Sequence, residues 1–310
     1  MKSRYIKHEL KYMLLSKQLI WFSLLLTALF VFAAYLSYKD TLLVNDNYVR
    51  HINYLTENNI DIQEELKKDY KKEVSDDGSK VNLTNPLSYY KEQLEQHLFY
   101  AAPKNSISKI GALIPIFFPF TFVIMGMCTY IYDIKNKTIK SKTVLMGKSS
   151  YFFNKAASLA AACFIVVFIS FAAASIINII FYFKLLNSIS SPIDLIQVSF
   201  NFKDFLLQLL FAVFLSIIYA FIGLLFGVIF RSVYVGIAFI FIRSFLPVLG
   251  EYDISNIINN FALKLYSYYG MVNIQVKGEP ADWTICILIF TVIFCTAAGL
   301  FISLKRSSFV

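Results

Sequence analysis

The sequence predicts an all-α integral membrane protein with six transmembrane helices. Of the 310 residues, 57% are apolar and only 16% are charged, and the mean hydropathy is +0.60. A soluble domain carries about 25% charged residues. Six apolar stretches follow one another along the chain, and all but one are long enough to cross the ~30 Å hydrocarbon core of a bilayer. An N-terminal amphipathic interfacial helix and a helical extracellular loop between the first two spans complete the predicted architecture.

Residues 1–17 are predicted to form an amphipathic helix that lies in the membrane interface. Basic residues cover most of its surface, and one face is apolar, a pattern typical of interfacial helices. The alternative is the n-region of a signal peptide, but the next apolar stretch is full length and no small-x-small cleavage site follows it. The apolar face consists of Tyr5, Ile6, Leu10, Met13 and Leu14.

The first span is predicted over residues 18–38 and the second over residues 110–132. Pro115 and Pro119 are four residues apart, so they lie on one face of the second span, near its outer end. Proline removes a backbone hydrogen bond inside a helix and bends it. We therefore expect a bent outer end in the second span.

Residues 39–109 form the one large polar segment, with ten basic and twelve acidic residues. Seventy residues without a disulfide framework hardly support a core of their own, so we expect an extracellular helical cap that rests on the spans. A charged helix is predicted over residues 60–74. A second helix should begin at Asn85-Pro86, an N-cap followed by proline at the first helical position.

Four further spans and one outer element follow in the second half of the chain. Gly223 and Gly227 form a Gly-x-x-x-Gly in the fourth span, which we interpret as a helix-packing face. Residues 251–282 mix acidic and amide side chains with tyrosines, which predicts a re-entrant or interfacial element outside the membrane. The spans are predicted over residues 156–183, 205–230, 233–250 and 283–304.

Arg243 is the ionisable residue predicted to lie deepest in the membrane, about 16 Å along the fifth span from Val233 at ~1.5 Å per residue. An ionisable residue at such depth is a functional-site hypothesis. Two interpretations stay open: Arg243 snorkels outward or pairs with Glu251 or Asp253, or it lines a substrate route. The candidates for that route are Arg243, Glu251, Asp253, Pro115 and Pro119.

The charge distribution predicts that both termini lie in the cytoplasm, because short loops rich in Lys and Arg stay inside. The inside segments would be residues 1–17, 133–155, 231–232 and 305–310, which hold 14 basic residues and only two acids, Glu9 and Asp133. Lysine outnumbers arginine 24 to 5, and Ile, Asn, Phe and Tyr are abundant. This bias indicates an AT-rich genome and hence a bacterial plasma membrane.

The sequence predicts no cofactor, metal or catalytic site on this chain. The three histidines have no metal-ligand spacing with other residues, and no nucleic-acid-binding motif occurs. Gly147-Lys148-Ser149 resembles part of a phosphate-binding loop, but Lys142 stands where the first glycine belongs and no strand precedes it. An intramembrane enzyme is disfavoured because no acid–base pair is visible. Cysteines lie only in apolar stretches, as small hydrophobes: Cys128, Cys163, Cys286 and Cys295.

The inside segment 133–155 carries six lysines and one acid between two long apolar stretches. It could be a solvated topological anchor. However, together with the amphipathic first helix, the large outer loop and the six spans, it resembles the ABC-2 type exporter permeases. The local match is Asp133, Lys137-Thr138-Ile139, Val144-Leu145 and Lys155, whereas Gly147-Lys148-Ser149-Ser150-Tyr151 replaces the Pro and Arg of the family pattern.

This resemblance implies that two permeases pair, as two copies or with a paralogue, and that each binds a separate cytoplasmic ATPase that holds ATP and Mg²⁺. Segment 133–155 would form a coupling helix seated in the ATPase, with the N-terminal helix beside it. Movement of spans two and five would then open a route for the substrate. The coupling residues would be Asp133, Thr138, Ile139, Val144, Leu145 and Lys155.

The expected function is export of an amphipathic or hydrophobic substrate, with a bacteriocin or cytolytic peptide favoured over small drugs and lipids. Membrane lipid is the other expected partner, and nucleic acid is not. The alternative function is a non-transporting immunity or sensor protein whose outer loop, residues 39–109, binds a peptide.

Overall fold

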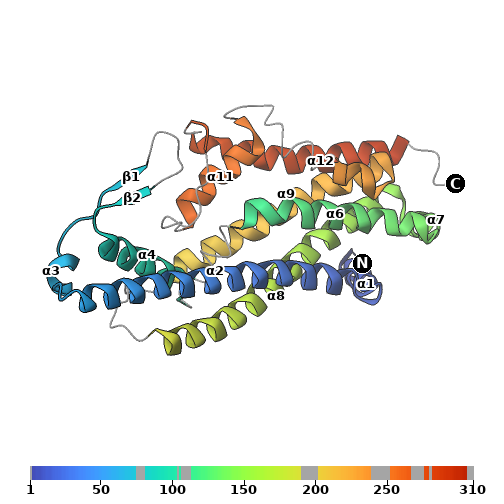
Figure 1. Cartoon of the computed structure of the whole chain (residues 1–310). Coiled ribbons are helices and arrows are strands. Elements are labelled where there is room, and N and C mark those ends of the chain that lie inside the picture. Colours follow the sequence, from blue (N-terminus) through green and yellow to red (C-terminus); the bar gives the residue numbers. More distant parts are fainter. Residues whose placement is uncertain are drawn as a thin grey trace.

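The computed structural model in Figure 1 shows an elongated bundle of long helices. It describes residues 2–74, 81–102, 105, 113–189, 202–238, 252–266, 276–278 and 281–305. Five helices are long and apolar enough to cross a membrane, which supports the predicted all-α, multi-pass membrane protein. These are α2 (Gln18–Glu57), α6 (Ile114–Lys135), α8 (Lys148–Ser188), α9 (Phe202–Phe230) and α12 (Ile285–Lys305).

The five long helices run in two directions (Figure 1). The helices α2 and α8 run away from the end of the bundle where the N-terminus lies, and α6, α9 and α12 run towards it. Parallel α9 and α12 are the arrangement expected if the predicted fifth span crosses the membrane between them. Residues 233–238 are helical. The rest of that span, 239–250, lies outside the described residues, and the sixth crossing stays a prediction.

Two of these helices extend well beyond the predicted spans. With 40 and 41 residues, α2 and α8 are each about 60 Å long at 1.5 Å per residue, twice the hydrocarbon thickness. The sequence explains this length because no Gly or Pro interrupts residues 18–57 or 148–188. The predicted span 18–38 is thus the first part of α2, and the polar segment after it begins as a continuation of the same helix.

The predicted helix over residues 60–74 is wrong. The helix α3 (Ile62–Leu66) has only five residues, and β1 (Lys72–Val74) pairs antiparallel with β2 (Val81–Leu83). Asn85 accounts for the early end of α3, because its Nδ2 donates to the carbonyl oxygens of Glu65 (2.7 Å) and Lys68 (2.8 Å). The Glu65 carbonyl is among those that the end of a helix leaves without an intrahelical partner, and the Lys68 carbonyl lies just beyond that end.

The second helix of the cap, α4 (Pro86–Ala101), begins where the sequence predicts. The side chain of Asn85 accepts a hydrogen bond from the Ser88 N–H, and Pro86 follows it in the first turn. A small apolar cluster joins α4 to the far ends of α2 and α8, so the cap does rest on the long helices as expected. This cluster contains Tyr48, Leu55, Leu87, Leu94, Leu98, Ala101 and Leu185.

The main core lies where α6 crosses α9 so closely that the backbones of the two helices are in contact. A Cβ atom at Gly223 would overlap the carbonyl oxygen of Val123, and one at Gly126 would overlap that of Ala220. At Gly227 a Cβ would lie 3.2 Å from the Cα of Met127. The predicted glycine motif therefore lies at this crossing, and Gly126 of α6 completes it. Small residues allow such close approach of helices in lipid.

The outer element before the last span contains a helix, α11 (Ile254–Leu265), that packs against α6, α9 and α12. Two hydrogen bonds tie its C-terminal end to α9. Gln208 donates to the Leu265 carbonyl at 2.8 Å, and the Tyr266 hydroxyl donates to the Gln208 carbonyl at 2.8 Å. A short 3-10 helix, η3 (Asp282–Thr284), then leads into α12.

The close crossing of α6 and α9 predicts that two glycine substitutions destabilise the protein to different degrees. Gly223→Ala should destabilise the protein by about 1–3 kcal/mol, the usual cost of overpacking, because the clash is with rigid backbone. Gly227→Ala should cost less, since its Cβ would lie 3.2 Å from the Met127 backbone, a tight contact that a shift of a few tenths of an ångström relieves. Unfolding of both variants in mixed micelles would measure the difference. Equal stability of the two variants would contradict this description of the crossing.

Candidate functional site

Four charged side chains from four helices, three buried and one partly buried, meet at the end of the bundle that holds α1 (Lys2–Leu15) and α7 (Thr138–Met146). They are Glu9 of α1, Asp133 of α6, Lys142 of α7 and Lys155 of α8. Their side chains are 4%, 0%, 14% and 2% exposed, respectively. We call this group the four-charge ring.

Each acid of the four-charge ring contacts both lysines. Lys142 Nζ lies 2.7 Å from Glu9 Oε1 and 2.9 Å from Asp133 Oδ1. Lys155 Nζ lies 2.8 Å from Glu9 Oε2 and 2.7 Å from Asp133 Oδ2. The charges therefore alternate around a closed ring with no net charge.

Further groups satisfy the remaining hydrogen-bonding capacity of Asp133. The Tyr151 hydroxyl donates to Oδ2 at 2.7 Å, and the Thr138 hydroxyl donates to Oδ1 at 3.0 Å. The ammonium group of Lys142 also lies 4.3 Å from the centre of the Tyr12 ring, a cation–π contact. A buried ion pair offsets its loss of hydration only with good geometry and such additional hydrogen bonds.

Helical spacing places these groups on single faces. Thr138 and Lys142 are four residues apart on α7, and Tyr151 and Lys155 are four apart on α8, so each pair lies on one side of its helix. Two tight joints set the helices at the required angles. Lys137, with φ of 56°, separates α6 from α7, and Gly147, with φ of 77°, separates α7 from α8. Glycine adopts this left-handed region without steric cost.

The ring holds Lys142 in its charged form. Burial by itself would lower the pKa of this ammonium group, but the carboxylates of Asp133 and Glu9 outweigh it and raise the pKa above the ordinary 10.5. A raised folded-state pKa stabilises the fold below the unfolded pKa, and this contribution is lost as pH rises through the folded value. The contribution of Lys142 is thus complete at neutral pH and is lost only in strongly alkaline solution.

The α7 helix also carries two neighbouring apolar side chains that are largely exposed. Val144 is 78% exposed and Leu145 is 76% exposed. Lys140 and Ser141 are exposed beside them. By contrast, Ile139 and Met146 pack against the main core. We call Lys140, Ser141, Val144 and Leu145 the outer face of α7.

The structure thus divides the six residues assigned to coupling into two groups. Asp133, Thr138 and Lys155 belong to the ring or donate to it, and Ile139 packs inward. Only Val144 and Leu145 lie on the outer face of α7.

The residues predicted along a substrate route are more scattered. Pro115 and Pro119 line a cavity between α6, α9, α11 and α12. Asp253 has a structural contact, since its carboxylate accepts the Ser255 N–H at 2.8 Å and caps α11. Arg243 and Glu251 lie outside the described residues, and so does any pairing between them.

Glu9, Lys142 and Tyr151 were not predicted from the sequence as members of this site. One signal was available: Glu9 and Asp133 are the only acids in the segments predicted to lie inside. An acid next to an excess of lysine on a helix that joins the core is a reasonable ion-pair candidate. Lys142 enters the sequence argument only because it occupies the position where a phosphate-binding loop has its first glycine. Tyr151 enters it only as part of the segment that replaces the Pro and Arg of the family pattern.

The ring does not have the composition of a metal centre, because two lysines already neutralise its two carboxylates. Nowhere in the described ranges do three or more His, Cys, Asp or Glu side chains gather as a metal would require. Comparison with protein-family models, with curated proteins and with solved structures found no match to this chain.

Removing one acid from the ring should strongly destabilise the protein. Asp133→Ala leaves two buried lysines facing the single carboxylate of Glu9, and an uncompensated buried charge costs about 3–5 kcal/mol. The free energy of unfolding in mixed micelles would measure this loss. Lys140→Met is the matched control, because Lys140 lies on the same helix and is exposed; it should change stability by less than about 0.5 kcal/mol.

The double variant Asp133→Ala, Lys155→Met tests the ring as a unit. It leaves the balanced pair of Glu9 and Lys142, so it should be more stable than Asp133→Ala alone. Two results would contradict a stabilising role for the ring. One is a free energy of unfolding for Asp133→Ala equal to that of Lys140→Met. The other is a double variant that is less stable than Asp133→Ala alone.

Proposed function

We propose that this chain is the membrane-spanning permease subunit of an ATP-driven exporter of the ABC-2 type. A separate cytoplasmic ATPase subunit would bind the outer face of α7 and hold the nucleotide and its Mg²⁺. A second permease, either a copy or a paralogue, would complete the transporter. The substrate class that suits the apolar, aromatic-rich membrane part is an amphipathic or hydrophobic molecule, with a bacteriocin or cytolytic peptide as the favoured cargo.

The observation that carries this proposal is the two-sided character of α7. Its inner side is joined to α1, α6 and α8 through the four-charge ring. Its outer side presents Val144 and Leu145 beside Lys140. A partner that covers this face needs an apolar groove with acidic residues at its rim. Such a partner could apply force directly to the membrane helices.

Short joints and buried ion pairs suit the transmission of a rigid-body movement. One or two residues connect α7 to α6 and to α8, so a push on α7 is not absorbed by a long loop. The α6 helix in turn crosses α9 at backbone distance. A displacement of α7 would therefore reach the packed centre of the membrane bundle.

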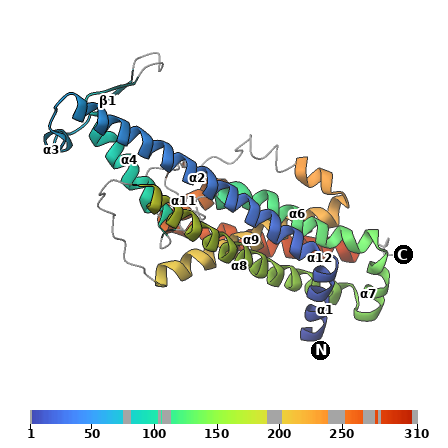
Figure 2. The same ribbon diagram turned by 60° about the horizontal axis from the view of Figure 1, so that its bottom comes forward.

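The placement of the termini supports the predicted topology. The helix α1, the helix α7 and the C-terminal end of α12 lie at one end of the bundle, and the strands and α3 lie at the opposite end (Figures 1 and 2). Residues 2–17 and 133–155, which hold eleven basic residues and only two acids, are at the first of these ends. By the positive-inside rule, that end would face the cytoplasm of a bacterial cell, and the cap would face outward.

Charge introduced on the outer face of α7 should abolish ATPase binding. The double variant Val144→Glu, Leu145→Glu puts two carboxylates where we expect an apolar, acid-rimmed groove, so the ATPase should no longer co-purify. Membrane insertion and thermal stability should be unchanged, because both side chains are exposed. Co-purification of an ATPase with the tagged chain, followed by its ATP hydrolysis rate, is the measurement.

Tyr54→Glu provides the matched control for this variant. Tyr54 is 57% exposed on the distant part of α2, so this change also replaces an exposed side chain by a carboxylate, but at the opposite end of the bundle. It should leave ATPase binding intact. A functional wild-type chain that recruits no ATPase would sink the proposal, as would a double variant that binds the ATPase normally.

A peptide-binding immunity or sensor protein is the second candidate, and the cap is the observation that favours it. The cap has its own apolar cluster around Leu87, Leu94 and Leu98, more structure than a simple connection between spans needs. Replacing residues 62–101, which include all of α4, by a flexible Gly/Ser linker separates the two functions. Under the exporter proposal, ATPase binding survives this change; under the alternative, all activity is lost and ATPase binding plays no part.

A further inference from the structure

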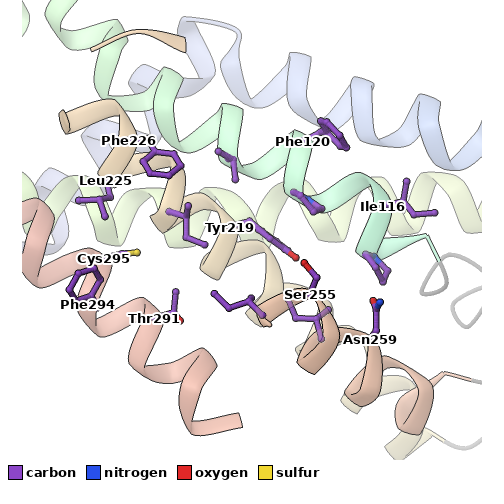
Figure 3. Close-up of a pocket in the computed structure, with 16 residues that line it drawn as sticks. Ile116, Phe120, Tyr219, Leu225, Phe226, Ser255, Asn259, Thr291, Phe294 and Cys295 are labelled. Atoms are coloured by element: carbon purple, nitrogen blue, oxygen red, sulfur yellow. The ribbon is translucent and has the colours of Figure 1, made fainter. Parts of the chain in front are cut away.

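A cavity of about 610 Å³ lies between α6, α9, α11 and α12, separate from the four-charge ring. Figure 3 shows side chains from all four helices pointing into it. This volume is within the range of small-molecule sites, which is roughly 300–1,000 Å³. The ring lies at the α7 end of the bundle, whereas Pro115 and α11 are at the opposite end of the span. The cavity is therefore a second site with its own chemistry.

The walls of the cavity are apolar and uncharged. None of the described residues that line it is Asp, Glu, Lys, Arg or His. A charged ligand would lose its hydration there without an ionic partner, which is strongly unfavourable. The large apolar side chains that line it include Phe120, Ile222, Leu225, Phe226, Ile258 and Phe294.

Among the described residues, four polar side chains line the cavity: Tyr219, Ser255, Asn259 and Thr291. Asn259 and Thr291 each offer an acceptor oxygen. Asn259 Oδ1 is buried and has no hydrogen-bond partner within the described part of the chain. The amide torsion of Asn is soft, so a small rotation can direct this oxygen to a ligand. The Thr291 hydroxyl already donates to the Ile287 carbonyl at 2.8 Å, which leaves its oxygen as an acceptor. A ligand that pairs with Asn259 Oδ1 must therefore supply a donor.

The polar side chains of α11 lie at one end of the cavity, whereas Thr291 lies beside the apolar residues of α12 (Figure 3). Asn259 and Ser255 of α11 lie near Ile116, and Phe226 and Phe294 lie towards the other end. The stretch of α6 that lines the cavity, from Pro115 to Val123, is about 12 Å long at 1.5 Å per residue. This is less than half of the ~30 Å hydrocarbon thickness. The cavity accommodates a headgroup and a short chain but not an entire phospholipid.

We propose that this cavity binds one uncharged amphiphile whose hydroxyl or amide group donates to Asn259 and whose aliphatic part lies against Phe226 and Phe294. The ligand is either a neutral membrane lipid with a small headgroup or a neutral amphiphilic cargo, since the two share this chemistry. The inference does not depend on the ATPase partner, because it concerns binding to the chain itself.

Photolabelling of the full chain in phosphatidylcholine nanodiscs tests this proposal directly. The probe is 3-azioctanol, an aliphatic alcohol with a photoreactive diazirine, and mass spectrometry locates the labelled residues. Labelling should saturate and should fall on the cavity-lining parts of α6, α9, α11 and α12. Decanol should compete at least ~10-fold better than ionised decanoate of the same chain length at pH 8, because the cavity cannot compensate a charge.

Three variants give the matched comparison. Asn259→Leu removes the acceptor and should weaken decanol competition by roughly five- to tenfold. Thr291→Trp fills the cavity and should abolish saturable labelling. Ile289→Trp is its control, since Ile289 lies on the same helix, is 46% exposed and does not line the cavity; it should label like the wild type. If Thr291→Trp fails to fold, Ile222→Trp fills the same space from α9.

Several outcomes would overturn the proposal: labelling distributed over the lipid-facing surfaces, equal competition by decanoate, or unchanged labelling of both Asn259→Leu and Thr291→Trp. The source of the ligand follows from a second measurement on protein purified from its own membrane. A membrane lipid would be retained at about one neutral lipid per chain and lost in Thr291→Trp. A cargo molecule would leave the purified chain without lipid while saturable labelling persists.

Discussion

The structure depends above all on two buried acids that are paired with a buried lysine, Lys155, and a partly buried one, Lys142. An isolated buried charge is costly, and a pair is stable only when geometry and hydrogen bonds are nearly complete. The four-charge ring meets this condition because Glu9 and Asp133 each contact both lysines, and Tyr151 and Thr138 donate to Asp133. Since the four charges come from four helices, α1, α6, α7 and α8 cannot separate there without exposing an unpaired charge.

The crossing of α6 and α9 extends this rigid connection into the membrane. Where Gly126 and Gly223 bring the two backbones together, there is no layer of side chains that could yield between them. Asp133 lies near the C-terminal end of the same α6 helix. A force on α7 therefore passes through the ring to α6 and through the crossing to α9. Protein interiors are close-packed and transmit such displacements.

Part of this structure could be predicted from the sequence because membrane helices follow from hydropathy alone. The long apolar stretches, the Asn85 cap and the Gly223–Gly227 packing motif all rest on local patterns. The length of α2, the short α3 and the strands around residues 72–83 were missed because they depend on how the polar segment packs. Of the ring residues, only Asp133 and Lys155 were predicted as site residues, for a similar reason. Glu9 and Lys155 are 146 residues apart, so no local sequence pattern links them.

The most direct test of the account is whether α1 and α7 move together when the ATPase binds nucleotide. Spin labels on the exposed positions Lys11 of α1 and Asn136 in the joint before α7, in a chain without its native cysteines, would report this distance by electron spin resonance. We predict that it stays constant between nucleotide-free and ATP-trapped complexes with the proposed ATPase, whereas the distance from Asn136 to a label at Phe301 of α12 changes. A change of several ångströms between α1 and α7 would contradict the claim that the ring makes them one rigid unit.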